Sequence, residues 1–184
     1  MEIKGTAVKS IIEYVEKVHP EKITDWYKSL SDNAKNIVNS VVTSGWYSIN
    51  EGVVEPTKKV GTLFFDNDFK KGAIESGKHS AEMALHGVYK LYVRVSKPGH
   101  IIERASRILP AYYRPSAMET QDRTSNSVKL VMSEMDEPSD IIEFRIQGWI
   151  EKALEISGCS EVIVKISESM AKGSSKTIFE VSWN

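Results

Sequence analysis

A long amphipathic helix is the feature of this 184-residue chain that most restricts its fold. Segment 77–92 repeats small and apolar residues at helical spacing, and the helix is predicted to run from about Phe69 to Val95. Glycine and alanine on its apolar face allow a neighbouring element to approach closely. That face comprises Ala73, Ile74, Gly77, Ala81, Ala84, Leu85, Val88, Leu91, Tyr92 and Val95. The helix is therefore expected to be the central packing element of the fold.

Further helices are predicted before Pro110. They cover the ranges 8–18, 20–30, 31–41, 51–65 and 100–109. Pro20 suits the first turn of a helix, and Ser31 is a suitable N-cap. Between the third and fourth of these helices, segment 44–48 places a glycine beside two aromatic residues and is predicted to be a turn.

The pattern changes to strands after Pro110. Strands are predicted over 112–120, 127–135, 161–166 and 177–183, with a helix over 141–157 between the two pairs. Gly158 is a suitable C-cap for that helix. The order indicates an α+β fold, in which N-terminal helices pack on a four-stranded antiparallel sheet with a β-β-α-β-β order. No linker or repeat divides the chain, so residues 1–184 are expected to form a single domain.

Composition excludes several classes of function. The formal net charge of -1 provides no field that would attract nucleic acid or an anionic membrane surface, and no apolar run is long enough to span a bilayer. A single cysteine, Cys159, rules out an intramolecular disulfide and favours a cytoplasmic location, and it is interpreted as a small buried residue. No nucleophile with a matching base and no phosphate-binding loop is found, so the protein is not expected to be an enzyme.

Several motifs carry a family resemblance across most of the chain. They are Gly45-Trp46-Tyr47, Gly77-Lys78-His79-Ser80-Ala81-Glu82, Tyr89-Lys90-Leu91, Gly148-Trp149-Ile150-Glu151-Lys152-Ala153-Leu154 and Phe179-Glu180-Val181-Ser182-Trp183. With these motifs, the chain resembles an uncharacterised bacterial family of the myxobacterial type. The wider superfamily contains H-NOX haem domains, 4-vinyl-reductase-like domains and TRAPP transport-particle subunits. The resemblance implies a ligand held between helices and sheet, or assembly of one subunit with another.

Small and aromatic residues suggest where such a ligand would bind. Small side chains on the long helix leave volume beside it, and aromatic residues gather where helix passes into sheet. The predicted ligand pocket comprises Gly77, Ala81, Tyr89, Tyr92, His100, Tyr112, Tyr113 and Trp149. The competing interpretation is that the same residues fill an ordinary core.

A polar stripe on the same helix is a weak candidate for a metal site. Glu75, His79, Glu82 and His86 are spaced so that all four share one face. Imidazole and carboxylate groups one turn apart can bind a transition metal, with His79, Glu82 and His86 as the candidate ligands. Lysines border the stripe and oppose a cation, so a solvated face without metal is the preferred interpretation.

His100 invites comparison with the proximal histidine of H-NOX domains, because it precedes apolar residues on a predicted helix. The H-NOX family carries a Tyr-x-Ser-x-Arg motif that binds the haem propionates, and this motif is absent from the chain. Other cations, such as Arg104, Arg107 or Arg114, would have to replace it. The sequence therefore predicts that the protein carries no cofactor, haem included.

The favoured function is a non-enzymatic sensor or regulatory domain that binds an apolar small molecule. Two alternatives remain open. The first is a structural or assembly module that acts as a homodimer, and the second is a haem-based gas sensor. An enclosed cavity would favour a ligand, whereas a filled core would favour assembly.

Overall fold

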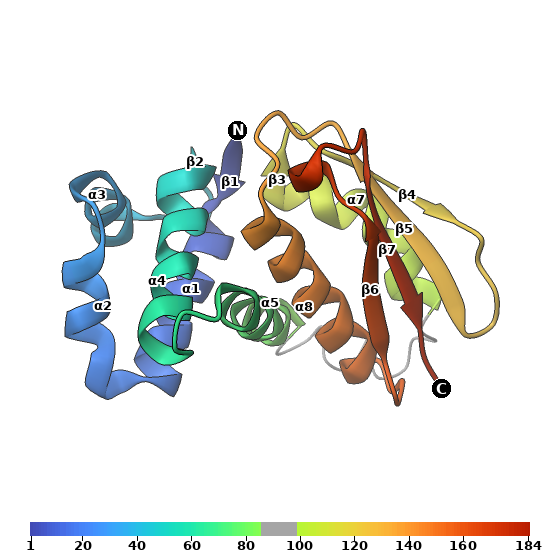
Figure 1. Ribbon diagram of the computed structural model, residues 1–184, viewed down its shortest axis with the longest axis horizontal. Helices are drawn as coiled ribbons and strands as arrows, with labels where there is room; N and C mark the ends of the chain where they lie inside the picture. The colour runs from blue at the N-terminus through green and yellow to red at the C-terminus, as the bar shows by residue number, and fades with distance from the viewer. Residues whose placement is uncertain (86–98) are drawn as a thin grey trace.

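The structure is a computed structural model that describes residues 1–85 and 99–184. It has an α+β architecture, with a helical N-terminal part beside a part built on an antiparallel sheet (Figure 1). Helices α5, Phe69–Leu85, and α8, Asp140–Ile156, lie between the N-terminal helices and the sheet (Figure 1). The predicted fold class is confirmed.

The N-terminal part follows the predicted helices closely. Its elements are β1 (Glu2–Lys4), α1 (Gly5–Val18), η1 (Pro20–Lys22), α2 (Ile23–Ser29), α3 (Asp32–Ser40), β2 (Trp46–Ser48), η2 (Asn50–Val54) and α4 (Glu55–Phe64). Ser31 caps α3, since its hydroxyl accepts a hydrogen bond from the Ala34 amide at 3.3 Å. The predicted helix Phe69–Val95 is observed as α5 over Phe69–Leu85, and its predicted continuation over 86–95 lies outside the described residues.

The C-terminal part contains the predicted sheet. Its elements are α7 (Gly99–Tyr112), β3 (Tyr113–Arg114), β4 (Ala117–Gln121), β5 (Ser127–Ser133), α8, β6 (Ile163–Glu168), η3 (Met170–Lys172) and β7 (Thr177–Ser182). The order β4-β5-β7-β6 is antiparallel throughout. Leu130 pairs with Phe179 on the buried face, whereas Lys129 pairs with Glu180 on the other face. One face of the sheet therefore carries apolar residues toward the core.

A second, three-stranded sheet was not predicted. In it, β1 lies between β2 and β3, so that Ile3 pairs with both Tyr47 and Tyr113. The sequence instead predicts a turn at 44–48, where β2 lies, and a single strand over 112–120, where β3 and β4 are separate. Those two predictions were wrong. Strands of two or three residues are too short to show alternation, and Pro115 separates β3 from β4.

Helices α5 and α8 pack closely through two glycines. Gly77 of α5 and Gly148 of α8 each face a backbone carbonyl of the opposite helix, with no space for a side chain. The close-packed interpretation of the small-residue face is therefore correct at Gly77. Ala81 on the same face and Cys159 beyond α8 are also buried, as predicted.

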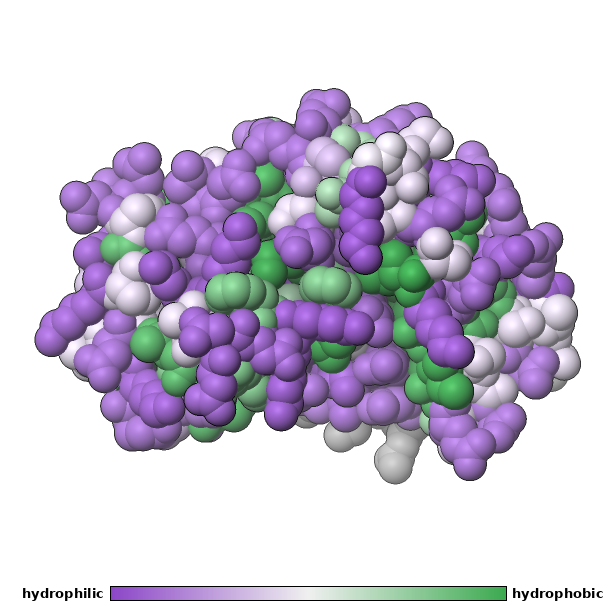
Figure 2. Space-filling view, in the orientation of Figure 1, coloured by the Kyte–Doolittle hydropathy of each residue, from purple (hydrophilic) through white to green (hydrophobic). Residues whose placement is uncertain are grey.

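The helices in residues 1–85 and 99–184 do not reach the length and apolarity that crossing a bilayer requires. On the face shown in Figure 2, hydrophilic residues predominate and hydrophobic residues form smaller patches between them.

Candidate functional site

A cavity of about 70 Å³ lies between α7, α8 and the buried face of the four-stranded sheet. Its apolar wall has three sources, which are α7, the sheet strands and α8. Representative lining residues are Ile102 and Leu109 of α7, Met118 and Leu130 of the sheet, and Ile146 and Leu154 of α8. Helical spacing explains this wall, since Ile102 and Leu109 are seven residues apart and Ile146 and Leu154 are eight apart.

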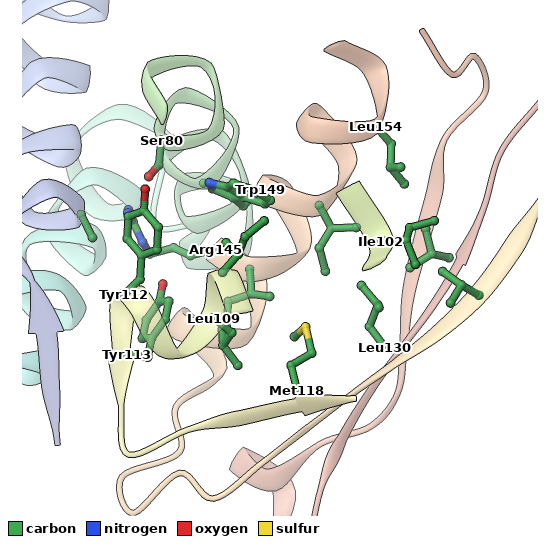
Figure 3. Close-up of a pocket in the computed structure, with 17 residues that line it drawn as sticks. Ser80, Ile102, Leu109, Tyr112, Tyr113, Met118, Leu130, Arg145, Trp149 and Leu154 are labelled. Carbon is green, nitrogen blue, oxygen red and sulfur yellow. The ribbon is translucent and has the colours of Figure 1, made fainter. Parts of the chain in front are cut away.

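One end of the cavity is polar and the other is apolar. Figure 3 shows the polar atoms of Ser80, Tyr112, Tyr113 and Arg145 gathered at one end. At the opposite end, Ile102, Leu130 and Leu154 present only carbon atoms (Figure 3). An amphipathic ligand would match this division.

Arg145 is the one charged residue among the described residues that line the cavity. Its exposure is 2%, so the guanidinium is removed from water. Nη1 donates to Thr57 Oγ1 at 3.3 Å, Nη2 donates to Ser10 Oγ at 3.5 Å, and Nε has no hydrogen-bond partner. Burial lowers the pKa of Arg145, and the Tyr113 hydroxyl opposes that change. An arginine remains protonated even so, and the cavity therefore borders a buried positive charge.

Tyr113 lies beside this charge. Burial raises the pKa of Tyr113, while the charge of Arg145 and a hydrogen bond from its side chain oppose the increase. The phenol therefore stays neutral at ordinary pH and acts as an acceptor for the guanidinium.

Glu143 is the carboxylate nearest to Arg145 in sequence on α8, but it is engaged elsewhere. It accepts hydrogen bonds from Ser169 Oγ and Thr177 Oγ1, both at 2.6 Å, and from the Ala171 amide at 3.1 Å. Among residues 1–85 and 99–184, Arg145 has no carboxylate partner. Its hydrogen-bond partners in the described part of the chain are neutral hydroxyl groups.

The structure brings together part of the pocket that the sequence predicts. Gly77, Tyr112, Tyr113 and Trp149 line the cavity. Ala81 is buried but is not part of the lining. His100 belongs to α7, although the position of its side chain is not described, and the candidates Tyr89 and Tyr92 lie outside the described residues. Ligand binding by these residues remains a prediction.

Arg145 is not among the predicted pocket residues, although the sequence carries a signal for it. Arg145 interrupts the apolar stripe of α8, which is made by Ile141, Ile142, Ile146, Trp149 and Ile150. A charged residue within such a stripe is buried with the rest of the stripe. The interruption could have identified Arg145 as a buried charge and a candidate site residue.

The polar stripe of α5 is less solvated than predicted. His79 contacts the Tyr14 ring at a centroid distance of 5.6 Å, and its Nε2 is buried without a hydrogen-bond partner. Glu75 forms an ion pair with Lys78 at 3.7 Å, and Glu82 forms one with Lys152 at 3.1 Å. In the described part of the chain, no three His, Cys, Asp or Glu side chains are grouped so as to hold a metal ion. His86 lies outside that part.

Comparison with known proteins identifies the fold through solved structures alone. No family model matches the chain, and no curated protein matches it by sequence. The Fe(II) unliganded H-NOX protein from K. algicida is 14% identical, with a TM-score of 0.68 over 99% of this chain and 97% of that chain.

Two further H-NOX structures are similar over the same extent. The S. oneidensis H-NOX protein in the Fe(II)NO state is 10% identical, with a TM-score of 0.75 over 99% of each chain. A mutant form of T. tengcongensis H-NOX is 12% identical, with a TM-score of 0.70 over 99% of this chain and 98% of that chain. At these identities the similarity shows that the chain has the H-NOX fold. Kinship with 4-vinyl-reductase-like domains, TRAPP subunits or the myxobacterial family stays a prediction.

The prediction that the protein carries no cofactor is contradicted by these comparisons, because the structural neighbours are haem-binding domains. That prediction was based on one missing motif, whereas the similarity of fold extends over nearly the whole chain. The cations suggested as substitutes for the motif do not line the cavity. Arg104 and Arg107 are exposed, and Arg114 pairs with Glu2 at 2.8 Å. The arginine at the cavity is Arg145 instead.

Proposed function

We propose that this chain is a ligand-binding sensor domain of the H-NOX type and that its prosthetic group is haem. The observation that carries the proposal is the similarity of fold, over 99% of the chain, to H-NOX proteins in Fe(II) and Fe(II)NO states. The cavity supports it, since it adjoins α7, the helix that carries His100. His100 precedes Ile102, which lines the cavity, by two residues.

The residues that line the cavity, together with a histidine on α7, suit haem in their chemistry. His100 would supply an imidazole as axial ligand, and Arg145 would offer a buried cation to a carboxylate. The apolar side chains of α7, α8 and the sheet would exclude water from the ligand. When bound, haem supplies an iron atom that a diatomic gas can coordinate.

The volume of the cavity fits haem less well than its chemistry does. The cavity of about 70 Å³ is smaller than the roughly 300–1,000 Å³ of typical cofactor and ligand pockets. Haem would therefore need more space between α7, α8 and the buried face of the sheet than the described conformation provides.

The small volume favours a second candidate function, which is direct binding of a small organic molecule by a sensor or regulatory domain. In both versions we propose a non-enzymatic role. A cytoplasmic location and a homodimeric assembly remain predictions from the sequence.

Native mass spectrometry tests the proposal on the protein as purified from cells supplied with a haem precursor. We expect a species heavier than the bare chain by the mass of one haem. Detection of the bare chain alone, under conditions that load a known H-NOX protein, would contradict the haem assignment. A smaller adduct would favour the second candidate.

A further inference from the structure

We propose that the cavity binds its ligand through a carboxylate group held by Arg145, with the apolar body of the ligand at the opposite end. The proposal rests on the proposed function for the position of the ligand, and it specifies the chemistry by which that ligand is recognised. The carboxylate belongs either to a haem propionate or to a free monocarboxylate, and the experiment below separates these sources.

The positive charge of Arg145 has no carboxylate partner among the described residues. Removing a cation from water costs several kcal/mol unless a counter-charge or a full set of hydrogen bonds replaces the solvent. Arg145 is 2% exposed, and its described partners Thr57, Ser10 and Tyr113 are neutral hydroxyls. A fold that keeps such a charge buried next to a cavity has a place for an anion in that cavity.

The geometry of the Arg145 guanidinium also suits a carboxylate. A carboxylate binds arginine best along an edge that offers two parallel N–H groups. On the edge formed by Nε and Nη2 of Arg145, Nε has no hydrogen-bond partner and Nη2 reaches Ser10 Oγ only at 3.5 Å, so Nε is available to a carboxylate oxygen. The end of the guanidinium is held by the shorter bond from Nη1 to Thr57, so the group is already oriented.

The side chains around the cavity are distributed as an amphipathic carboxylate would require. Ser80 and Tyr113 lie with Arg145 at the polar end and can add hydrogen bonds to a bound carboxylate (Figure 3). Leu130 and Leu154 lie at the other end, where an alkyl chain or a ring edge would displace water (Figure 3). In the observed conformation the cavity of about 70 Å³ would accept a short monocarboxylate.

Thermal melts with matched ligands test the role of the carboxylate. Hexanoate should raise the melting temperature of the wild-type protein in a saturable way, whereas hexanamide, which has the same chain without the charge, should not. In Arg145→Met the rise with hexanoate should disappear, and in Arg145→Lys its affinity should fall about tenfold or more, because lysine cannot bind with two parallel N–H groups. The wild-type comparison does not depend on the folding of either variant.

Haem and haem dimethyl ester distinguish the two sources of the carboxylate. If haem binds wild type at least about tenfold more tightly than the ester, and Arg145→Met removes the difference, the carboxylate is a propionate. If hexanoate binds and haem does not, the inference stands while the proposed haem function fails. If haem and its ester bind equally, and hexanoate acts no differently from hexanamide, the inference is overturned although the proposed function stands. If no ligand binds, both are overturned.

Discussion

The backbone carbonyl oxygen of Arg145 occupies the space that a side chain on Gly77 would need, since a Cβ atom on Gly77 would lie 2.1 Å from that oxygen. The relationship is reciprocal, because a Cβ on Gly148 would lie 2.2 Å from the carbonyl oxygen of Ile74. The two glycines therefore set the distance between α5 and α8. They also fix the position of the helix segment that carries Arg145 into the cavity.

Gly77→Ala should destabilise the protein by about 1–3 kcal/mol or more, because the new methyl group collides with backbone that cannot move aside alone. The same substitution at an unconstrained helical position stabilises by about 0.5–1 kcal/mol, so the sign of the change is diagnostic. Urea denaturation of Gly77→Ala and Gly148→Ala measures it. Stability equal to or above that of wild type in both variants would show that α5 and α8 can separate.

The sequence predicts the helices and the four-stranded sheet well, and the cavity less well. The four-stranded sheet and most helices are predicted because each repeats its apolar period over several turns or pairs, as in β5 and α8. The short strands β1, β2 and β3 offer no such period, and their pairing depends on contacts between distant segments. Periodicity also cannot show which residues of a buried face leave a space between them. Arg145 could have been found as a charge within an apolar stripe, but only the three-dimensional structure shows that the described residues place no carboxylate against it.

Arg145→Met should leave the stability of the ligand-free protein unchanged or raise it by up to about 4 kcal/mol, since an apolar side chain of similar length replaces a buried charge that has no counter-ion among the described residues. Urea denaturation without ligand measures the change. Arg104→Met, at an exposed position of α7, is the matched control and should change stability by no more than about 0.5 kcal/mol. A loss of several kcal/mol specific to Arg145→Met would mean that the guanidinium serves the fold.

Glu143→Leu should destabilise the protein by about 2–5 kcal/mol, because the hydroxyls of Ser169 and Thr177 and the amide of Ala171 would lose their acceptor in a buried place. Thr177→Val alone should lower the free energy of unfolding by less than Glu143→Leu does. Combined with Glu143→Leu, it should add less than its separate effect, since the two residues share one hydrogen bond. Strict additivity in this double-mutant cycle, measured by denaturation, would contradict the network.

Because of His79, the free energy of unfolding should decrease as the pH is lowered below about 6.5. Burial lowers the pKa of His79, although Glu82 and Glu13 oppose the change. The unfolded chain therefore takes up a proton at a higher pH than the folded protein does. Unfolding becomes more favourable as the pH decreases from the ordinary histidine pKa toward the lower pKa of the folded state. His79→Phe keeps a ring against Tyr14 and should make the decline in unfolding free energy shallower. An identical pH profile for wild type and His79→Phe would exclude this role, and His19, whose pKa is also lowered by burial, would be tested next.

Haem titration followed by absorption spectroscopy is the most direct test of the proposed sensor function. Wild-type protein should develop a Soret band that saturates at one haem per chain, and the band should shift on exposure of the reduced protein to nitric oxide. His100→Ala should lose the saturable band, and added imidazole should restore it, because the free ligand can take the place of the missing side chain. A wild-type protein that shows no saturable Soret band, or a band that His100→Ala leaves unchanged, would contradict haem binding through α7.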